Sequence, residues 1–132
     1  MKIEFEHPLH FCLDVIEIDD HVPSMRVEAK IVVTQFQHTF RYAGMFWIAC
    51  ENWDIFKDAL RSSLEKNAVL QDMNGYFTLS VSSKAEGLWL SWEFTKDDLG
   101  GGKKTKVSFS SEIDDDMFSK IKSQFLEFPA WW

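Results

Sequence analysis

The sequence predicts an α+β protein in which an antiparallel β-sheet of about six to eight strands is accompanied by one central and one C-terminal α-helix. Three observations support this class. Apolar and polar residues alternate over most of the chain, apolar residues recur at helical spacing in only two segments, and turn-forming residues separate the alternating segments. The chain contains no internal repeat and no linker, so we expect a single domain over residues 1–132.

The strands of the first half of the chain are predicted by alternation. Apolar residues fall at every second position between charged or polar residues, as they do in half-buried strands. In one segment the alternation changes phase between Val15 and Ile16, which indicates a bulge or a bend. The expected strands are residues 2–6, 11–18, 26–33 and 40–48.

A central helix is predicted over residues 51–67. Asn52 is expected to cap its N-terminus, and Asp54 to interact with the positive end of the helix dipole. Apolar residues recur at intervals of three and four residues, which places them on one buried face. These residues are Trp53, Phe56, Leu60 and Leu64.

Three further strands are predicted in the second half of the chain, over residues 77–81, 88–95 and 106–111, with turns at DMNG and SSKAEG. The segment Asp97–Thr105 is rich in glycine and lysine, but its spacing does not match a phosphate-binding loop and it lies between two strands. We interpret it as a flexible hairpin tip, a place where loops often contact partners.

The acidic stretch SSEIDDDMF precedes the closing helix. Asp114 is expected to cap this helix, with Asp115 and Asp116 in its first turn, because carboxylates accept hydrogen bonds from the unpaired N–H groups there. Consecutive carboxylates at a helix start point in different directions and lack the spaced ligands of a calcium loop, so a divalent metal site is disfavoured here. The buried face is predicted to contain Phe118, Ile121, Phe125 and Phe128, and Pro129 ends the helix.

The charge balance excludes some partners. With 14 Lys and Arg against 21 Asp and Glu, the net charge is −7, which repels nucleic acid and attracts a basic partner. The longest apolar run, residues 42–50, is shorter than the ~20 residues that cross a membrane. The N-terminal segment interleaves charged and apolar residues and so lacks the uninterrupted apolar core of a secretory signal. We therefore expect a cytoplasmic protein with no membrane partner.

Catalytic and metal-binding patterns are not found in the sequence. Cys12 and Cys50 lie in apolar stretches outside any nucleophile motif and are expected to be buried, reduced thiols. His7 and His10 are three residues apart, but we see no cysteine or carboxylate set that would complete a zinc site with them. We therefore expect no enzyme activity, no cofactor and no metal.

A partner surface is the remaining interpretation of the acidic and aromatic residues. Most aromatic residues fit the buried faces, but Trp89 alternates out of phase with Leu88, Leu90 and Trp92, so either both faces of the sheet are covered or Trp89 is exposed. Trp47, Trp131 and Trp132 raise the same question. The residues expected to bind a partner are Asp97, Asp98, Asp115, Asp116, Glu112 and Trp89.

The order of the elements also resembles a known family. A strand pair ending in RVEAKIVV is followed by FWIACENWDIFKDALRSSLEK, by AVLQDMNGYFTLSVSS and GLWLSWEFT, and then by a strand and a helix. This pattern resembles the WapI-type immunity proteins of bacterial polymorphic toxin and contact-dependent growth inhibition systems. The resemblance implies a cytoplasmic protein that neutralises the C-terminal domain of a cognate toxin. Such toxins are often nucleases with basic clefts, to which an acidic inhibitor is complementary.

Two other classes of function remain open from the sequence. The protein would be a carrier of a small apolar ligand if a curved sheet enclosed a cavity, in which case Trp92 and Phe94 would face a void. It would be a structural adaptor if its exposed aromatic residues held it in a larger assembly.

Overall fold

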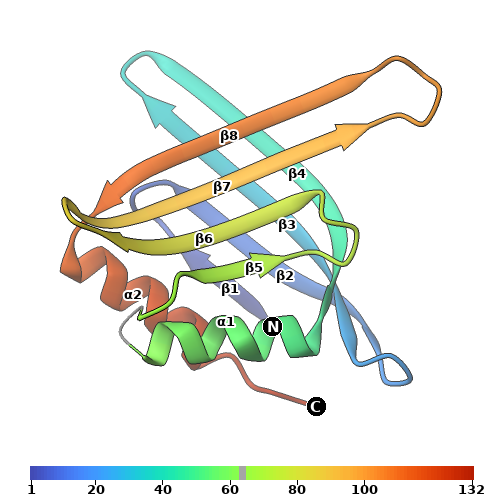
Figure 1. Ribbon diagram of the computed structural model, residues 1–132, viewed down its shortest axis with the longest axis horizontal. Coiled ribbons are helices and arrows are strands. Elements are labelled where there is room, and N and C mark those ends of the chain that lie inside the picture. Colours follow the sequence, from blue (N-terminus) through green and yellow to red (C-terminus); the bar gives the residue numbers. More distant parts are fainter. Residues whose placement is uncertain (63–64) are drawn as a thin grey trace.

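Eight strands and two helices make up the computed structural model, which describes residues 1–62 and 65–132 (Figure 1). This confirms the predicted α+β class, with one central and one C-terminal helix. The elements are β1 (Lys2–Phe5), β2 (His10–Asp19), β3 (Ser24–Gln35), β4 (His38–Ala49), α1 (Cys50–Arg61), β5 (Ala68–Gln71), β6 (Phe77–Lys84), β7 (Gly87–Asp97), β8 (Lys104–Ile113) and α2 (Asp115–Leu126).

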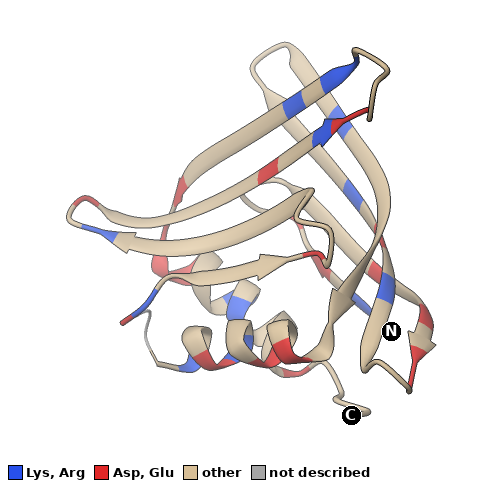
Figure 2. Cartoon of the chain, turned by 45° about the vertical axis from the view of Figure 1, so that its right-hand side comes forward, with Lys and Arg blue, Asp and Glu red and all other residues tan. Residues whose placement is uncertain are grey.

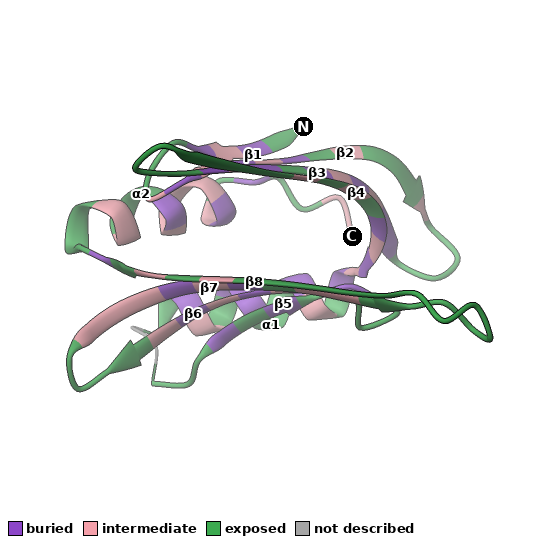
Figure 3. Ribbon diagram, turned by 90° about the horizontal axis from the view of Figure 1, so that it is seen from above, coloured by how far each residue is buried: buried purple, intermediate pink, exposed green. Residues whose placement is uncertain are grey.

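The strands divide between two antiparallel sheets of four strands each, in the orders β1-β2-β3-β4 and β5-β6-β7-β8. Strands adjacent in sequence are therefore adjacent in space, and α1 joins the two sheets. Figure 3 shows the sheets as two layers that face each other. The two helices lie at one side of these layers, where α2 packs on β1, α1 packs on β5, and the helices touch each other (Figure 1). Strands β1 and β4 are the edges of the first sheet, and β5 and β8 are the edges of the second.

The core lies between the inner faces of the sheets, and alternation decides which residues reach it. On β3, Val27, Ala29 and Ile31 are fully buried, whereas Glu28 and Lys30 point to the outer face and pair with each other at 2.9 Å. The predicted change of phase in β2 is confirmed, because its register on β3 shifts between Val15 and Glu17.

Aromatic side chains make the contact between the sheets. Phe46 of β4 stacks on Phe77 of β6 with 4.7 Å between ring centroids. Tyr42 of β4 lies 5.4 Å from the ring of Trp92 and 5.3 Å from that of Phe94, both on β7. Such pairs contribute roughly 0.5–1.5 kcal/mol beyond the area that they bury. The packing of the two sheets therefore depends on residues from both halves of the chain.

Gly44 makes room for one of these rings. A Cβ atom at this position would collide with the hydroxyl group of Tyr42, which lies over the Gly44 backbone. A side chain at this point of β4 would have to displace the Tyr42 ring, and glycine leaves the ring its place close to the main chain.

Helix α1 begins earlier and ends earlier than predicted. Its N-terminal cap is Ala49, without a side-chain hydrogen bond, so the predicted capping role of Asn52 is wrong. The side-chain oxygen Oδ1 of Asn52 instead accepts a hydrogen bond from the backbone N–H of Gln71 at 2.9 Å, which ties α1 to β5. The buried positions of Trp53, Phe56 and Leu60 are confirmed. Leu64 lies outside the described residues.

Helix α2 packs against α1 through aromatic residues. The ring of Phe125 lies 5.6 Å from Trp53 and 4.8 Å from Phe56, and Phe128 lies 5.1 Å from Trp53. Ile121, Phe125 and Phe128 are buried as predicted, whereas the predicted core residue Phe118 is half-buried.

The C-terminal segment folds back on α1. The indole Nε1 of Trp132 donates a hydrogen bond to Oδ2 of Asp54 at 2.8 Å, and Trp131 packs against Trp132. Both tryptophans are half-buried and contact the core. They therefore do not form the exposed aromatic surface that was considered from the sequence.

Two other expectations concern the membrane and the thiols. None of the helices in the described part of the chain is long and apolar enough to span a membrane.

Both cysteines are free; Cys50 is buried as expected, but Cys12 is half-buried on the outer face of its sheet. Burial raises the pKa of both thiols.

The environment of Tyr42 predicts a dependence of stability on pH. Burial, with a smaller effect of the Asp72 carboxylate, raises the pKa of Tyr42 to about 12 in the folded protein. An unfolded tyrosine has a pKa near 10, so the stability contributed by the neutral phenol is present below about pH 10 and is lost as the pH rises toward the folded value. The free energy of unfolding of wild type and Tyr42→Phe is measured by chemical unfolding at a series of pH values. The series starts at about pH 9, which is ~1 unit below the pKa of an unfolded tyrosine.

The wild-type free energy of unfolding should fall more steeply over this range than that of Tyr42→Phe. Tyr76→Phe, at an exposed position, serves as the matched control and should keep the steep fall. Parallel profiles for wild type and Tyr42→Phe would show that Tyr42 is not buried between the sheets.

Candidate functional site

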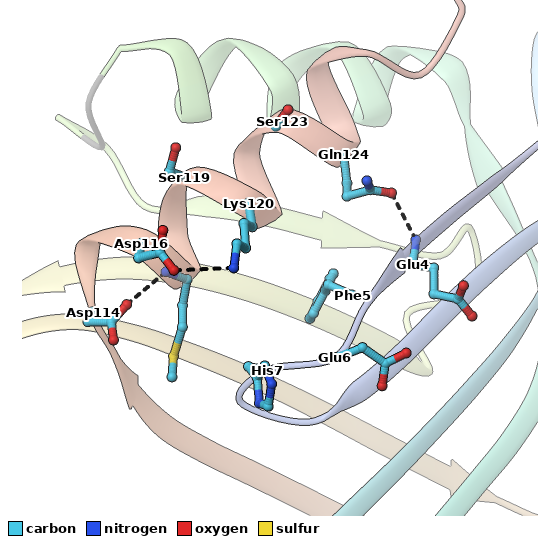
Figure 4. A pocket seen from close by; sticks show the side chains of 11 residues that line it. Glu4, Phe5, Glu6, His7, Asp114, Asp116, Ser119, Lys120, Ser123 and Gln124 are labelled. Carbon is cyan, nitrogen blue, oxygen red and sulfur yellow. Dashed lines mark hydrogen bonds and ion pairs between the residues drawn. The ribbon is translucent and has the colours of Figure 1, made fainter.

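A groove between the start of α2 and the end of β1 gathers most of the carboxylates at this end of the molecule (Figure 4). We call it the acidic groove; its volume is about 600 Å³. Four carboxylates and a single lysine line it. The lining residues are Glu4, Phe5, Glu6, His7, Asp114, Asp116, Met117, Ser119, Lys120, Ser123 and Gln124.

Helix capping fixes one wall of the groove. Oδ1 of Asp114 accepts a hydrogen bond from the backbone N–H of Met117 at 2.7 Å, which confirms Asp114 as the N-cap of α2. Asp115 and Asp116 occupy the first turn, as predicted. Capping uses only Asp114 in this way, so the other two carboxylates remain exposed for other contacts.

The opposite wall is attached to the helix by a backbone hydrogen bond. The backbone N–H of Glu4 donates to Oε1 of Gln124 at 3.1 Å, which holds β1 beside α2 (Figure 4). Along the α2 wall of the groove, Lys120 pairs with Asp116, one helical turn earlier, at 3.3 Å. Both of these side chains are largely exposed, so the pair contributes little stability and a competing cation can displace it.

Two further predicted site residues lie at the same end of the molecule. Trp89 on β7 is directly opposite Glu112 on β8, and Glu112 is two residues before the cap Asp114. Trp89 is half-buried, and the Lys84 ammonium lies 5.1 Å from its ring centroid. Its indole N–H has no hydrogen-bond partner among residues 1–62 and 65–132. Trp89 is therefore neither fully covered nor fully exposed: its ring is half-buried and the Lys84 ammonium lies over it.

Asp97 and Asp98 lie elsewhere. They are at the far end of β7, eight residues beyond Trp89, which corresponds to roughly 25 Å along the strand. Lysines surround them, so the β7–β8 hairpin tip has more positive than negative charges (Figure 2). These lysines are Lys96, Lys103, Lys104 and Lys106. The structure therefore does not bring Asp97 and Asp98 together with the other predicted partner-binding residues, and the tip does not extend the acidic surface.

A cluster that the sequence analysis did not anticipate lies beside the groove. The side chains of Glu4, Glu6 and His10 place one ligand atom each within 4.8 Å of one another. His10 Nε2 is 3.2 Å from Oε2 of Glu4 and 3.6 Å from Oε1 of Glu6. Hydrogen bonding to His10 and the charge of Lys2 lower the pKa of Glu4. Of the two histidines considered from the sequence, only His10 joins the two carboxylates, and the alternation of Glu4 and Glu6 on one face was the available signal.

Comparison of the chain with models of protein families, with curated proteins and with solved structures finds no match.

The cap on α2 yields a stability prediction. Replacing Asp114 with alanine removes the acceptor for the Met117 N–H, and should lower the free energy of unfolding by about 0.5–2 kcal/mol. Asp115→Ala is the matched control, because Asp115 acts only through the helix dipole, an effect of roughly 0.3–1 kcal/mol. Urea unfolding of both variants measures the difference, and an equal or larger effect of Asp115→Ala would contradict the assignment of the cap.

Proposed function

We propose that this chain is a cytoplasmic immunity protein that binds and neutralises the C-terminal domain of a cognate toxin, a basic nuclease, without catalysing a reaction itself. Two observations support the proposal: the order of the elements resembles that of WapI-type immunity proteins, and carboxylates are concentrated on one part of the surface. It places the interface at the acidic groove and at the residues that adjoin it.

The observation that carries the proposal is the concentration of carboxylates at one end of the molecule. Glu4, Glu6, Asp114 and Asp116 line the acidic groove against the single Lys120. A nuclease must present a positive surface to its phosphate substrate, and arginine or lysine side chains from such a surface match carboxylates in a groove. Complementary charges of this kind accelerate association and select the partner.

The interface proposed here includes four of the six residues expected from the sequence. Glu112, Asp115 and Asp116 supply charge beside the groove, and Trp89 supplies a partly covered aromatic surface next to Glu112. Asp97 and Asp98 are left out, because they lie at the basic tip of the β7–β8 hairpin.

The two alternative functions are affected differently by the packing. A carrier of apolar ligands needs space beside Trp92 and Phe94, but both rings pack on Tyr42, which counts against a carrier.

A structural adaptor is favoured by Phe36 and Leu99, which are fully exposed at the tips of two hairpins. Phe36 also has a positive φ of 54°, a conformation that is unfavourable for a phenylalanine.

Growth rescue tests the proposed function. The wild-type chain is co-expressed with the toxin domain encoded beside its gene, and growth is compared with that of cells expressing the toxin domain alone. We expect rescue by the wild type and loss of rescue by the double variant Asp115→Lys/Asp116→Lys, because reversing two charges repels a basic partner. The association rate of the purified proteins should fall in the same variant, most clearly at low salt.

The matched control is Asp97→Lys/Asp98→Lys, which reverses the same number of charges at the distant tip and should rescue growth like the wild type. Absence of rescue by the wild type would reject the immunity function. Rescue by Asp115→Lys/Asp116→Lys at the wild-type level would reject the acidic end as the interface, while leaving the function itself in place.

A further inference from the structure

Glu4, Glu6 and His10 form a compact set of metal-ligand side chains, which we call the His–carboxylate cluster. It lies where β1 turns into β2, on the outer face of the sheet. His10 Nε2 faces one oxygen of each glutamate, at 3.2 Å and 3.6 Å. An imidazole nitrogen between two carboxylates is a donor set that differs in kind from the purely acidic run at the start of α2.

We propose that the His–carboxylate cluster binds one divalent transition-metal ion, with Zn²⁺ as the best match. Imidazole nitrogen and carboxylate oxygen are ordinary zinc ligands, and three protein ligands with an open fourth position are typical of zinc sites that keep a water molecule or take up another ligand. Calcium and magnesium are disfavoured, because both prefer sites made entirely of oxygen ligands.

The distances agree with this assignment. In a tetrahedral zinc site with metal–ligand bonds of about 2.0–2.2 Å, neighbouring ligand atoms lie roughly 3.4 Å apart. The separations of 3.2 Å and 3.6 Å between His10 Nε2 and the two glutamate oxygens lie on either side of this value. The two glutamate oxygens lie within 4.8 Å of each other, so binding requires them to approach the same tetrahedral separation.

The backbone that presents the three ligands is held by the core. Phe5 and Phe11, which are paired across the β1–β2 register, stack with 4.8 Å between ring centroids, and Leu9 in the connecting turn is buried. Glu4 and Glu6 alternate with Phe5, so they point outward while Phe5 points inward. A rigid hairpin of this kind reduces the entropy that the site loses on binding a metal.

One cation competes for the cluster, but on a different oxygen atom. Lys2 pairs with Oε1 of Glu4 at 3.6 Å, whereas His10 faces Oε2. Both Lys2 and Glu4 are partly exposed, so their pair is weak and leaves Oε2 for a metal ion.

A candidate for a fourth ligand lies on the neighbouring strand, outside the group of atoms that lie within 4.8 Å of one another. Cys12 lies directly opposite Glu4 in the β1–β2 register and two residues after His10, on the same outer face. Its half-buried thiol is a candidate for the fourth position, which a water molecule would otherwise occupy.

Isothermal titration of the metal-free full-length chain with ZnCl2 tests the proposal. We expect saturable binding of one equivalent, weakened at least about tenfold by Glu6→Gln and by His10→Asn, since each removes a ligand. Binding should also weaken as the pH falls, because the ligands must be deprotonated. Circular dichroism of each variant checks that the fold is retained, and His21→Asn, at the exposed β2–β3 turn, is the matched control and should bind like the wild type.

Cobalt spectroscopy provides the second readout. Bound Co²⁺ should give visible absorption in the wild type that is lost in His10→Asn, and a thiolate-to-cobalt band that disappears in Cys12→Ser would identify the fourth ligand. The proposal is overturned if the wild type shows no saturable zinc binding. It is also overturned if Cys12→Ser abolishes binding while Glu6→Gln and His10→Asn leave it unchanged, since the metal would then be held by a different set of residues.

Discussion

Each of the two sheets has one apolar face, and neither can bury that face by itself. In the structure the two sheets lie face to face, and their apolar faces are buried against each other. Residues that precede α1 and residues that follow it therefore belong to one core. Tyr42 and Phe46 on β4 meet Phe77 and Trp92 from the second sheet. The other features follow from this contact: α1 must connect the sheets, α2 must return to β1, and the polar residues must occupy the outer faces and the ends.

The sequence predicted the elements better than it predicted their assembly. Alternation is a local signal, so seven of the strands, the change of phase in β2 and the cap at Asp114 were identified from neighbouring residues. The division into two sheets depends on which strands pair, and no local pattern encodes it. Asn52 was assigned to a cap because capping is local, whereas its observed partner is Gln71, nineteen residues away.

The candidate site was predicted only in part, for the same reason. Glu112, Asp115 and Asp116 are close in sequence at the junction of β8 and α2, and Glu112 lies opposite Trp89 in the β7–β8 pair. Glu4 and Glu6 reach the groove only because β1 lies beside α2, more than a hundred residues later in the chain. Asp97 was grouped with them by charge, but a long hairpin separates it from them.

The two proposals share residues, and this couples them. Glu4 and Glu6 line the acidic groove and also belong to the His–carboxylate cluster. A bound zinc ion would neutralise two of the four carboxylates that we propose for a basic partner. Metal and partner would therefore weaken each other's binding by the same factor. Under the proposed function, zinc availability would in this way alter how tightly a basic partner is held.

Hydrogen–deuterium exchange of the chain, alone and bound to its toxin domain, tests the central claim most directly, because it locates the interface without any substitution. The account predicts slower exchange on binding at the first turn of α2 and in the turn between β1 and β2, where the walls of the acidic groove lie. Protection confined to the tip between β7 and β8, residues 98–103, with no change at the start of α2, would contradict it.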